Sequence, residues 1–175
     1  SFYEEVRGEE YLTFNPGTLL GGTFVDYDSK KSSGTVFGKT NVVAQKTIVN
    51  GGLRFISEEQ KENARKKMSE IVKQNLPQTK ATISFTDSYP AMAPSEGNKL
   101  LLTILNEVSL SLGHKGVTAY DPGKRGAADI SFVADYVDSL DGLGTMGDGA
   151  HTLKETVNLK TMNALIQRTA IFIYR

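Results

Sequence analysis

The chain contains no cysteine, and only two of its 175 residues are histidine. The lack of cysteine excludes disulfides, thiolate metal sites and a cysteine nucleophile. Twenty basic side chains balance twenty acidic ones, so the formal net charge is zero and nothing in the composition favours binding to a polyanion. No hydrophobic run approaches the roughly 18–20 residues that a membrane-spanning helix needs. We therefore expect neither nucleic acid nor a membrane as a partner.

The start of the chain carries no targeting signal. Residues 1–5 do not resemble a signal peptide, and the first residue is not methionine. We therefore expect a processed or truncated start, with any export signal upstream of residue 1. The lack of cysteine does not separate a cytoplasmic from a periplasmic protein, so the compartment stays open.

The first half of the sequence predicts β-strands. Residues 10–14 and 19–27 are extended segments, separated by the turn signal Asn15-Pro16-Gly17. Polar residues 28–34 predict a hairpin loop. Residues 35–55, rich in Val, Thr and Ile, predict a second extended region that breaks at Asn50-Gly51-Gly52.

A helix and one more strand follow. Ser57 and Gln60 form a capping-box pattern, and Pro77 is the expected stop signal. Residues 81–86 alternate between apolar and polar side chains, as a half-buried strand does. The helix carries one apolar face, formed by Ala64, Met68, Ile71 and Val72. These elements predict an α+β fold, an antiparallel sheet covered on one face.

Two prolines within Ser88–Pro94 indicate a boundary, so we predict two domains, 1–90 and 91–175. The second begins with a helix capped by Ser95 and ended by Gly113. Its remaining elements alternate between strands predicted at 117–120 and 137–140, helices predicted at 127–136 and 158–174, and a glycine-rich loop at 141–149. This alternation is typical of an α/β layer.

Few residues carry a chemical signal of their own. His114 follows a helix end, where a cation can satisfy terminal carbonyls, so we interpret it as structural. His151 stands beside the glycine-rich loop, and histidine is the commonest metal ligand, but the pattern alone slightly favours a structural role. Arg54 in a strand pattern is usually solvated, although its planar fork suits a carboxylate. Asn41 is an equally weak signal.

Five segments, in their order along the chain, resemble the M20 family of zinc metallopeptidases. Gly17–Thr23, Thr40–Ala44 and Gly52–Phe55 are similar to the middle of the lid (dimerisation) domain of that family. Lys124–Phe132 is similar to a glycine-rich turn in its catalytic domain, and Leu143–Glu155 to its terminal metal-ligand loop. The resemblance covers almost the whole chain and is nearest to the glutamate carboxypeptidase branch.

The resemblance implies a fold and a set of roles. Residues 1–90 would form most of a ferredoxin-like two-layer lid, incomplete at its start, and residues 91–175 the C-terminal part of an α/β catalytic domain. The site residues implied are His151 as a zinc ligand, Arg54 as the clamp for the substrate carboxylate, Asn41 as a hydrogen-bonding partner of the reacting carbonyl region, and Gly126 as part of the substrate pocket.

The resemblance says less about two further residues. Glu155 would orient the loop of His151, and the role of Arg125 stays open because the family pattern suggests a small residue there. The resemblance also implies two zinc ions in the intact enzyme and a homodimer formed through the lid.

The chain by itself lacks the groups that this chemistry needs. The family places most metal ligands and its general-base glutamate upstream of the lid, and a catalytic zinc needs about three protein ligands. We therefore expect a fragment with zinc absent or weakly bound and no activity of its own. Three functions remain open: a zinc exopeptidase cleaving next to a free C-terminal carboxylate, a related aminoacylase or deacylase acting on N-acyl amino acids, and a non-catalytic α+β dimerisation or binding module.

Overall fold

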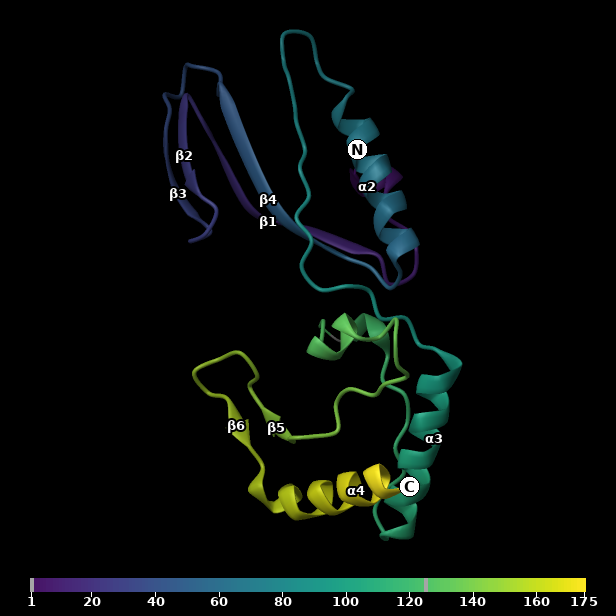
Figure 1. Cartoon of the computed structure of the whole chain (residues 1–175). Helices are drawn as coiled ribbons and strands as arrows, with labels where there is room; N and C mark the ends of the chain where they lie inside the picture. The colour runs from purple at the N-terminus through teal and green to yellow at the C-terminus, as the bar shows by residue number, and fades with distance from the viewer. Residues whose placement is uncertain (1, 125) are drawn as a thin grey trace. The chain divides into compact units, whose positions relative to one another are not determined.

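The computed structural model describes residues 2–124 and 126–175. The chain has a mixed α+β fold (Figure 1) and divides into two compact units. The first unit ends at Phe85 and the second runs from Thr86 to Arg175, whereas the sequence places the domain boundary between residues 90 and 91. Among the described helices, none is long and apolar enough to cross a membrane.

The first unit is built on a long two-stranded ribbon. Strand β1 (Thr13–Gly22) pairs antiparallel with β4 (Lys46–Arg54). Both breaks predicted from the sequence, at residues 15–17 and 50–52, are wrong, because each strand continues through its turn signal. Pro16 lies opposite Gly51, and the register shifts between Pro16 and Thr18. The ladder tolerates the missing proline N–H at this irregularity, and Gly51 has no side chain to collide with the backbone of Asn15.

The predicted hairpin between residues 28 and 34 is confirmed. Strands β2 (Phe24–Asp28) and β3 (Ser33–Phe37) form a second two-stranded sheet. Asp28 closes the turn, because its Oδ1 accepts hydrogen bonds from the N–H groups of Lys30 (2.9 Å) and Lys31 (3.2 Å). Gly22 lies so close to the carbonyl of Phe37 that a side chain there would collide with it.

Helix α2 (Glu58–Val72) begins as predicted, and the short α1 (Phe2–Glu5) precedes the strands. The Ser57 hydroxyl accepts a hydrogen bond from the Gln60 N–H at 3.1 Å. The Gln60 side chain accepts from the N–H of Ile56 and donates to the carbonyl of Glu10, each at 3.0 Å, and so links the end of β4 to the turn before β1. The helix ends at Val72, so Pro77 is not its stop signal.

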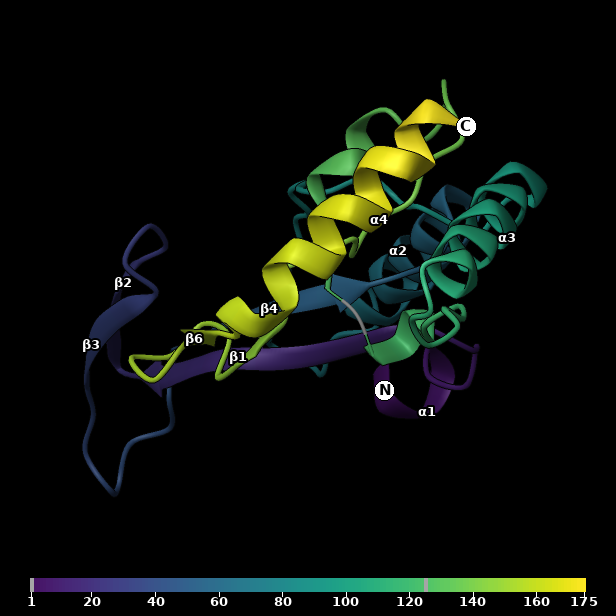
Figure 2. The same cartoon turned by 90° about the horizontal axis from the view of Figure 1, so that it is seen from below.

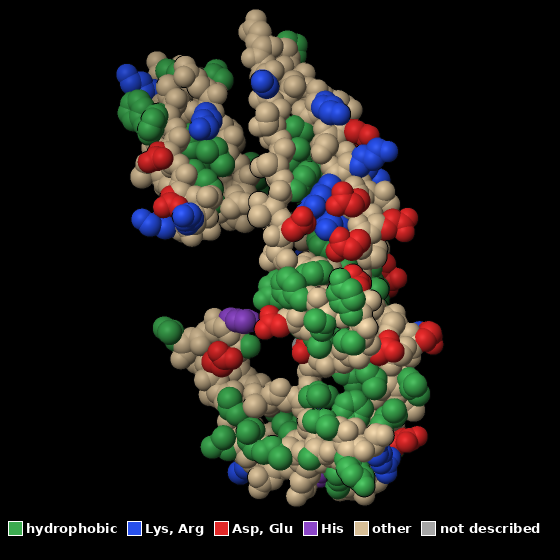
Figure 3. Space-filling model, viewed as in Figure 1, with side chains coloured by type: hydrophobic (Ala, Val, Ile, Leu, Met, Phe, Trp, Pro, Cys, Tyr) green, Lys and Arg blue, Asp and Glu red, His purple; other side chains and the backbone are tan. Residues whose placement is uncertain are grey.

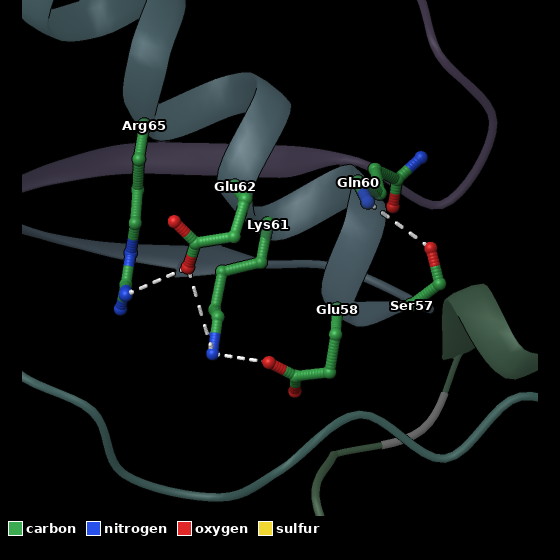
Figure 4. A network of polar contacts seen from close by, with 6 residues as sticks. All are labelled: Ser57, Glu58, Gln60, Lys61, Glu62 and Arg65. Carbon is green, nitrogen blue, oxygen red and sulfur yellow. Dashed lines mark hydrogen bonds and ion pairs between the residues drawn. The ribbon is translucent and has the colours of Figure 1, made fainter.

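Ionic pairs run along one side of the first turns of α2. Figure 4 shows Lys61 between the carboxylates of Glu58 and Glu62, and Arg65 Nη1 lies 3.3 Å from Glu62 Oε1. On the inner face, a small hydrophobic core consists of Val6, Leu12, Ala64 and Met68, with Phe2, Phe14, Leu53, Phe55, Ile71 and Ile83 packed against it.

The strand predicted at residues 81–86 does not form. The segment is irregular, and the N–H of Ala81 bonds to the side chain of Asn75 at 2.8 Å. Ile83 packs against the core, and the Arg65 guanidinium lies 5.2 Å from the centre of the Phe85 ring. The alternating pattern predicts that backbone hydrogen bonds to a neighbouring strand hold this segment. In the structure, side-chain packing holds it instead.

The second unit begins with α3 (Glu96–Ser111), whose two ends are as predicted. The Ser95 hydroxyl accepts a hydrogen bond from the Asn98 N–H at 3.0 Å. At the other end Gly113 has φ +73°, and the N–H groups of Gly113 and His114 bond to the carbonyls of Leu110 and Ser109. This pair of bonds is a Schellman motif, which needs the left-handed conformation that glycine adopts at little cost.

An acidic residue covers the N-terminus of α3. The Ser95 hydroxyl donates to Asp138 Oδ1 at 3.0 Å, and the Ser139 N–H donates to Asn98 Oδ1 at 2.9 Å. A side chain at Gly97 would collide with the Asp138 carboxylate. A negative charge at this end of a helix is favourable, so these bonds dock residues 138–139 onto the first turn of α3.

The predicted strands at 117–120 and 137–140 and the helix at 127–136 are wrong. Side chains of α3 take the backbone donors instead: Val117 N–H bonds to Asn106 Oδ1 at 2.8 Å, and Ser139 N–H bonds to Asn98. Between these segments lie two single-turn 3₁₀ helices, Pro122–Lys124 and Asp129–Phe132.

The C-terminal helix is confirmed. A 3₁₀ turn at Leu159–Thr161 leads into α4 (Met162–Tyr174), which packs on α3. Figure 2 shows the two helices from below. Before them, β5 (Gly147–Asp148) and β6 (Thr156–Val157) form a short antiparallel hairpin. The described part of the second unit holds no parallel sheet, so its α/β layer is not formed.

Candidate functional site

Arg54 is the last residue of β4 and lies opposite Thr13 in the ladder. Its side chain is exposed, whereas its neighbours Leu53 and Phe55 pack against the core of the first unit. Within the described residues the guanidinium has no hydrogen-bond or ion-pair partner. A rigid strand therefore presents a planar cation with all its donors available, which is the geometry that suits a carboxylate.

Asn41 lies at the other end of the same ribbon. It belongs to the exposed loop 38–45, and the Gln45 N–H bonds to the Gly22 carbonyl at 3.0 Å. Gly22 pairs with Lys46, at the start of β4. The eight steps from Lys46 to Arg54 span roughly 26 Å at the rise of a β-strand. The structure therefore does not bring Asn41 and Arg54 together.

His151 lies in the loop that joins β5 to β6. Its side chain is exposed, and its backbone has φ +63°. The preceding Gly149 has φ +70°, and a Cβ there would lie 2.8 Å from the Lys154 carbonyl oxygen, so this position requires glycine. The loop therefore presents the His151 imidazole to solvent.

Thr152, which the sequence analysis does not single out, holds this loop. Its hydroxyl donates to the Gly149 carbonyl at 2.7 Å and accepts from the Lys154 N–H at 3.1 Å. The family resemblance implies that Glu155 orients the loop. In the structure its backbone N–H bonds to the Thr152 carbonyl at 3.2 Å, and its carboxylate has no partner among the described residues. Hydroxyl side chains commonly close turns in this way, but a threonine in a loop is too frequent to mark such a role by itself.

Neither histidine is part of a metal-binding cluster. Residues 2–124 and 126–175 contain no group of three or more His, Asp or Glu side chains arranged to hold a metal ion. His114 is half buried behind the Schellman motif of α3, and its Nε2 makes no hydrogen bond. The described residues therefore do not by themselves fit a catalytic zinc.

Gly126 is exposed, and a Cβ at this position would meet no atom within 4 Å. Space therefore does not require glycine here. Arg125 lies outside the described residues.

A tyrosine and a carboxylate form a contact that the sequence did not predict. The Tyr89 hydroxyl donates to Asp129 Oδ1 at 3.0 Å, and the Tyr89 ring lies 5.3 Å from that of Phe132. The hydrogen bond and the negative charge of Asp129 raise the pKa of Tyr89 above the usual 10.0. The contact holds the beginning of the second unit against the Asp129–Phe132 turn.

We expect one of the seven tyrosines to ionise late in a spectrophotometric titration of the phenol groups. Because the folded-state pKa of Tyr89 is raised, the stabilisation from its hydrogen bond is complete below the ordinary tyrosine pKa and is lost as the pH rises through the raised value. Asp129→Asn should return the late group to the range of the others, and Tyr120→Phe, at an exposed tyrosine, should leave it in place. Identical curves for the wild type and Asp129→Asn would contradict this assignment.

Comparisons of this chain with protein-family models, with curated proteins and with solved structures find no match.

Proposed function

We propose that this chain is part of a zinc-dependent exopeptidase of the glutamate carboxypeptidase type, which hydrolyses a peptide or amide bond next to a free C-terminal carboxylate. The observation that carries the proposal is the state of Arg54, an exposed guanidinium without a partner among the described residues, held at the end of a strand. The order of the five family-like segments supports it, as does the presentation of His151 on a glycine-rich loop.

The role of Arg54 in this proposal is binding. Two parallel N–H···O bonds from its fork to a substrate carboxylate would select substrates with a free C-terminus and fix their orientation. His151 would contribute one metal ligand to the intact enzyme. Because the described residues do not complete a zinc site, the proposal takes the remaining ligands and the general base from outside this chain, and we derive no catalytic step here.

The roles of Asn41 and Gly126 belong to the same proposal with less support. Asn41 and Arg54 lie at opposite ends of β4, whose eight steps span roughly 26 Å, too far for one small substrate to touch both within one copy. Gly126 offers an exposed backbone without a steric reason for glycine.

In this proposal the first unit is most of a ferredoxin-like lid, built from the β1–β4 and β2–β3 ribbons and helix α2. We propose that it forms a homodimer through the segment 81–86, which has an alternating pattern but no ladder. Paired antiparallel with its copy about Ser84, the segment places Ile83 opposite Phe85 of the other copy, so apolar side chains meet on one face and hydroxyls on the other.

Two other functions remain in competition. An aminoacylase or deacylase would use the same metals and the same arginine, with an N-acyl amino acid as substrate. A non-catalytic α+β dimerisation or binding module would need no metal, and its strands could pair with those of a second copy about a two-fold axis.

The coding sequence upstream of Ser1 gives the first test. A His-x-Asp motif and a Glu-Glu pair encoded there would supply the missing ligands and base, as the exopeptidase proposal requires. A start codon immediately before Ser1 would contradict the exopeptidase proposal and favour the non-catalytic module.

In the protein that carries these ligands, Arg54→Ala should lower kcat/KM by roughly tenfold to a thousandfold, because a charge-assisted hydrogen bond contributes about 1.5–3 kcal/mol and a bidentate pair more. Arg54→Lys should not restore activity, since a point charge lacks the fork. Lys46→Ala, at an exposed cation on the other end of β4, is the matched control and should change little. Unchanged kinetics together with a large fall in Tm for Arg54→Ala would make this residue structural.

A further inference from the structure

Two cations of helix α2 lie beside carboxylates, whereas Arg54 does not. Lys67 Nζ lies 3.1 Å from Glu9 Oε1, and Arg65 Nη1 lies 3.3 Å from Glu62 Oε1. Figure 3 shows acidic and basic side chains mixed over this helix. Arg54 has no such partner among the described residues, so its charge is open to an anion from outside the chain.

Arg54 shares one face of the β1–β4 ribbon with two polar side chains of β1. Thr13 lies directly opposite it in the register, and Asn15 lies opposite Gly52, two residues before it in β4. Alternate residues of a strand point to the same face, so these four residues share one side of the ribbon and the core lies on the other. The three side chains are exposed and make no hydrogen bond within the described residues.

Gly52 leaves open space between these side chains. A Cβ at this position would meet no atom within 4 Å, so nothing covers the strand there. Directly opposite residues of a ladder have Cβ atoms about 4.5–5.5 Å apart, and diagonal neighbours lie about 7–8 Å apart. Thr13 is the opposite and Asn15 the diagonal neighbour of Arg54. An anion held by Arg54 therefore lies within reach of the Thr13 hydroxyl, and a ligand that extends over Gly52 reaches the Asn15 amide.

A contact between Asn50 and Tyr27 ends the open part of this face. Asn50 is the next residue of β4 on the same side after Gly52, and its Nδ2 donates to the Tyr27 hydroxyl at 2.8 Å. Four steps of β4 separate Asn50 from Arg54, roughly 13 Å at the rise of a strand. The open stretch therefore accommodates the end of a peptide and is too short for a long extended segment.

We propose that this face binds the C-terminal end of a peptide, with the terminal carboxylate on Arg54 and Thr13 and the last amide on Asn15. The guanidinium pairs with the carboxylate, and the Thr13 hydroxyl donates one further hydrogen bond to it. The Asn15 side chain carries both a donor and an acceptor, as a peptide amide does, so it can bond to either group of that amide. Arg54 is the one charged residue among these strand residues, which suits a carboxylate better than a doubly charged phosphate.

In this arrangement Asn15 takes the contact that the family resemblance implies for Asn41. Asn41 and Arg54 lie at opposite ends of β4, so one small ligand cannot touch both within one copy. Asn15 lies on the same face as Arg54 and one diagonal step away in the ladder. The inference rests on the proposed function, because it extends the binding site of Arg54 by two residues.

Heteronuclear NMR of the purified chain with three probes tests the proposal. N-acetylglycine carries a free carboxylate and the adjacent amide, acetate carries the carboxylate alone, and N-acetylglycinamide has no free carboxylate. N-acetylglycine should shift the signals of the Arg54 Nε–H and the Asn15 side-chain NH₂ group. Acetate should shift the Arg54 signal alone, and N-acetylglycinamide should shift neither. An unmoved Asn15 signal with N-acetylglycine, or an unmoved Arg54 signal with both carboxylates, would overturn the proposal.

Substitutions on the face measure the share of each side chain. Asn15→Ala should weaken the binding of N-acetylglycine by roughly twofold to tenfold, the factor that one hydrogen bond contributes, and leave that of acetate unchanged. Thr13→Val keeps the shape and removes the hydroxyl, so it should weaken both probes. Asn63→Ala and Thr35→Val, at exposed residues of α2 and β3, are the matched controls and should change neither. Wild-type affinity for N-acetylglycine in Asn15→Ala would contradict the proposal.

Kinetics of a longer protein that carries the missing metal ligands separate this inference from the proposed function. The NMR measurements need neither zinc nor turnover. If the chain binds the probes as expected and the longer protein hydrolyses no peptide, the binding face stands and the proposed function fails. If Arg54→Ala lowers kcat/KM of the longer protein and Asn15→Ala does not, the proposed function stands and the inference about Asn15 fails.

Discussion

The purified chain, supplied with zinc, is expected to release no product from peptides ending in glutamate or from N-acyl amino acids. Cleavage of an amide needs a metal-bound water and a carboxylate base, and a catalytic zinc needs about three protein ligands. The described residues place no group of three His, Asp or Glu together, and His151 is exposed on its loop. Turnover within tenfold of a typical enzyme rate of about 10 s⁻¹ would contradict the expectation.

Calorimetry of zinc binding supplies the control for this experiment. The chain alone should show no tight site, and His151→Ala should change its weak uptake of zinc only slightly. A longer protein that includes the missing ligands should bind zinc tightly and lose at least one equivalent when His151 is replaced. If that variant keeps all its zinc and activity, His151 is not a ligand and the non-catalytic module becomes the better reading.

Met68→Ala is expected to destabilise the first unit by about 2–5 kcal/mol, because it deletes a buried side chain and leaves a cavity. Met68 is 4% exposed and packs with Val6, Leu12 and Ala64, the only other members of that core cluster in the described residues. Such a loss is a large part of the roughly 5–15 kcal/mol that stabilises a typical domain. Denaturant unfolding followed by far-ultraviolet circular dichroism measures it.

Leu76→Ala is the matched control for the core substitution. Leu76 is 76% exposed just beyond α2, so its truncation should change the free energy of unfolding by less than about 0.5 kcal/mol. Equal effects at the two positions would mean that the packing around Met68 contributes little to stability.

Helices and their ends could be predicted from the sequence because their signals are local. Ser57, Ser95 and Gly113 each act on backbone groups within one turn, and each does so in the structure. Strands depend on distant partners, which local patterns do not specify. The turn signals at residues 15–17 and 50–52 therefore failed: they lie opposite each other in the β1–β4 ladder, where β1 takes up one extra residue beside the two glycines of β4 and both strands continue.

The strands predicted in the second unit failed for a related reason. Asn98 and Asn106, on α3, bond to the backbone of Ser139 and Val117 and take donors that a ladder would have used. A pattern of alternating side chains does not indicate that an asparagine elsewhere in the chain will accept a hydrogen bond from the backbone of the segment.

The candidate site could be predicted only in part. Arg54 and His151 are exposed and available, as their residue types suggest, but the separation of Asn41 from Arg54 depends on the full length of β4. Thr152 and the Tyr89–Asp129 pair had no sequence signal strong enough to single them out, because the meaning of each depends on a partner that only folding brings near.

The irregularity beside Pro16 has a consequence for the course of the β1–β4 ribbon. Gly17 of β1 has no partner in the register while β4 runs on without a break, and an extra residue of this kind bends its strand and increases the local twist. On one side of this level the ribbon is anchored to the core through Phe14 and Leu53. On the other side it continues to Gly22 and the loop of Asn41, so the bend at this level sets the direction in which the Asn41 end of the ribbon leaves the core.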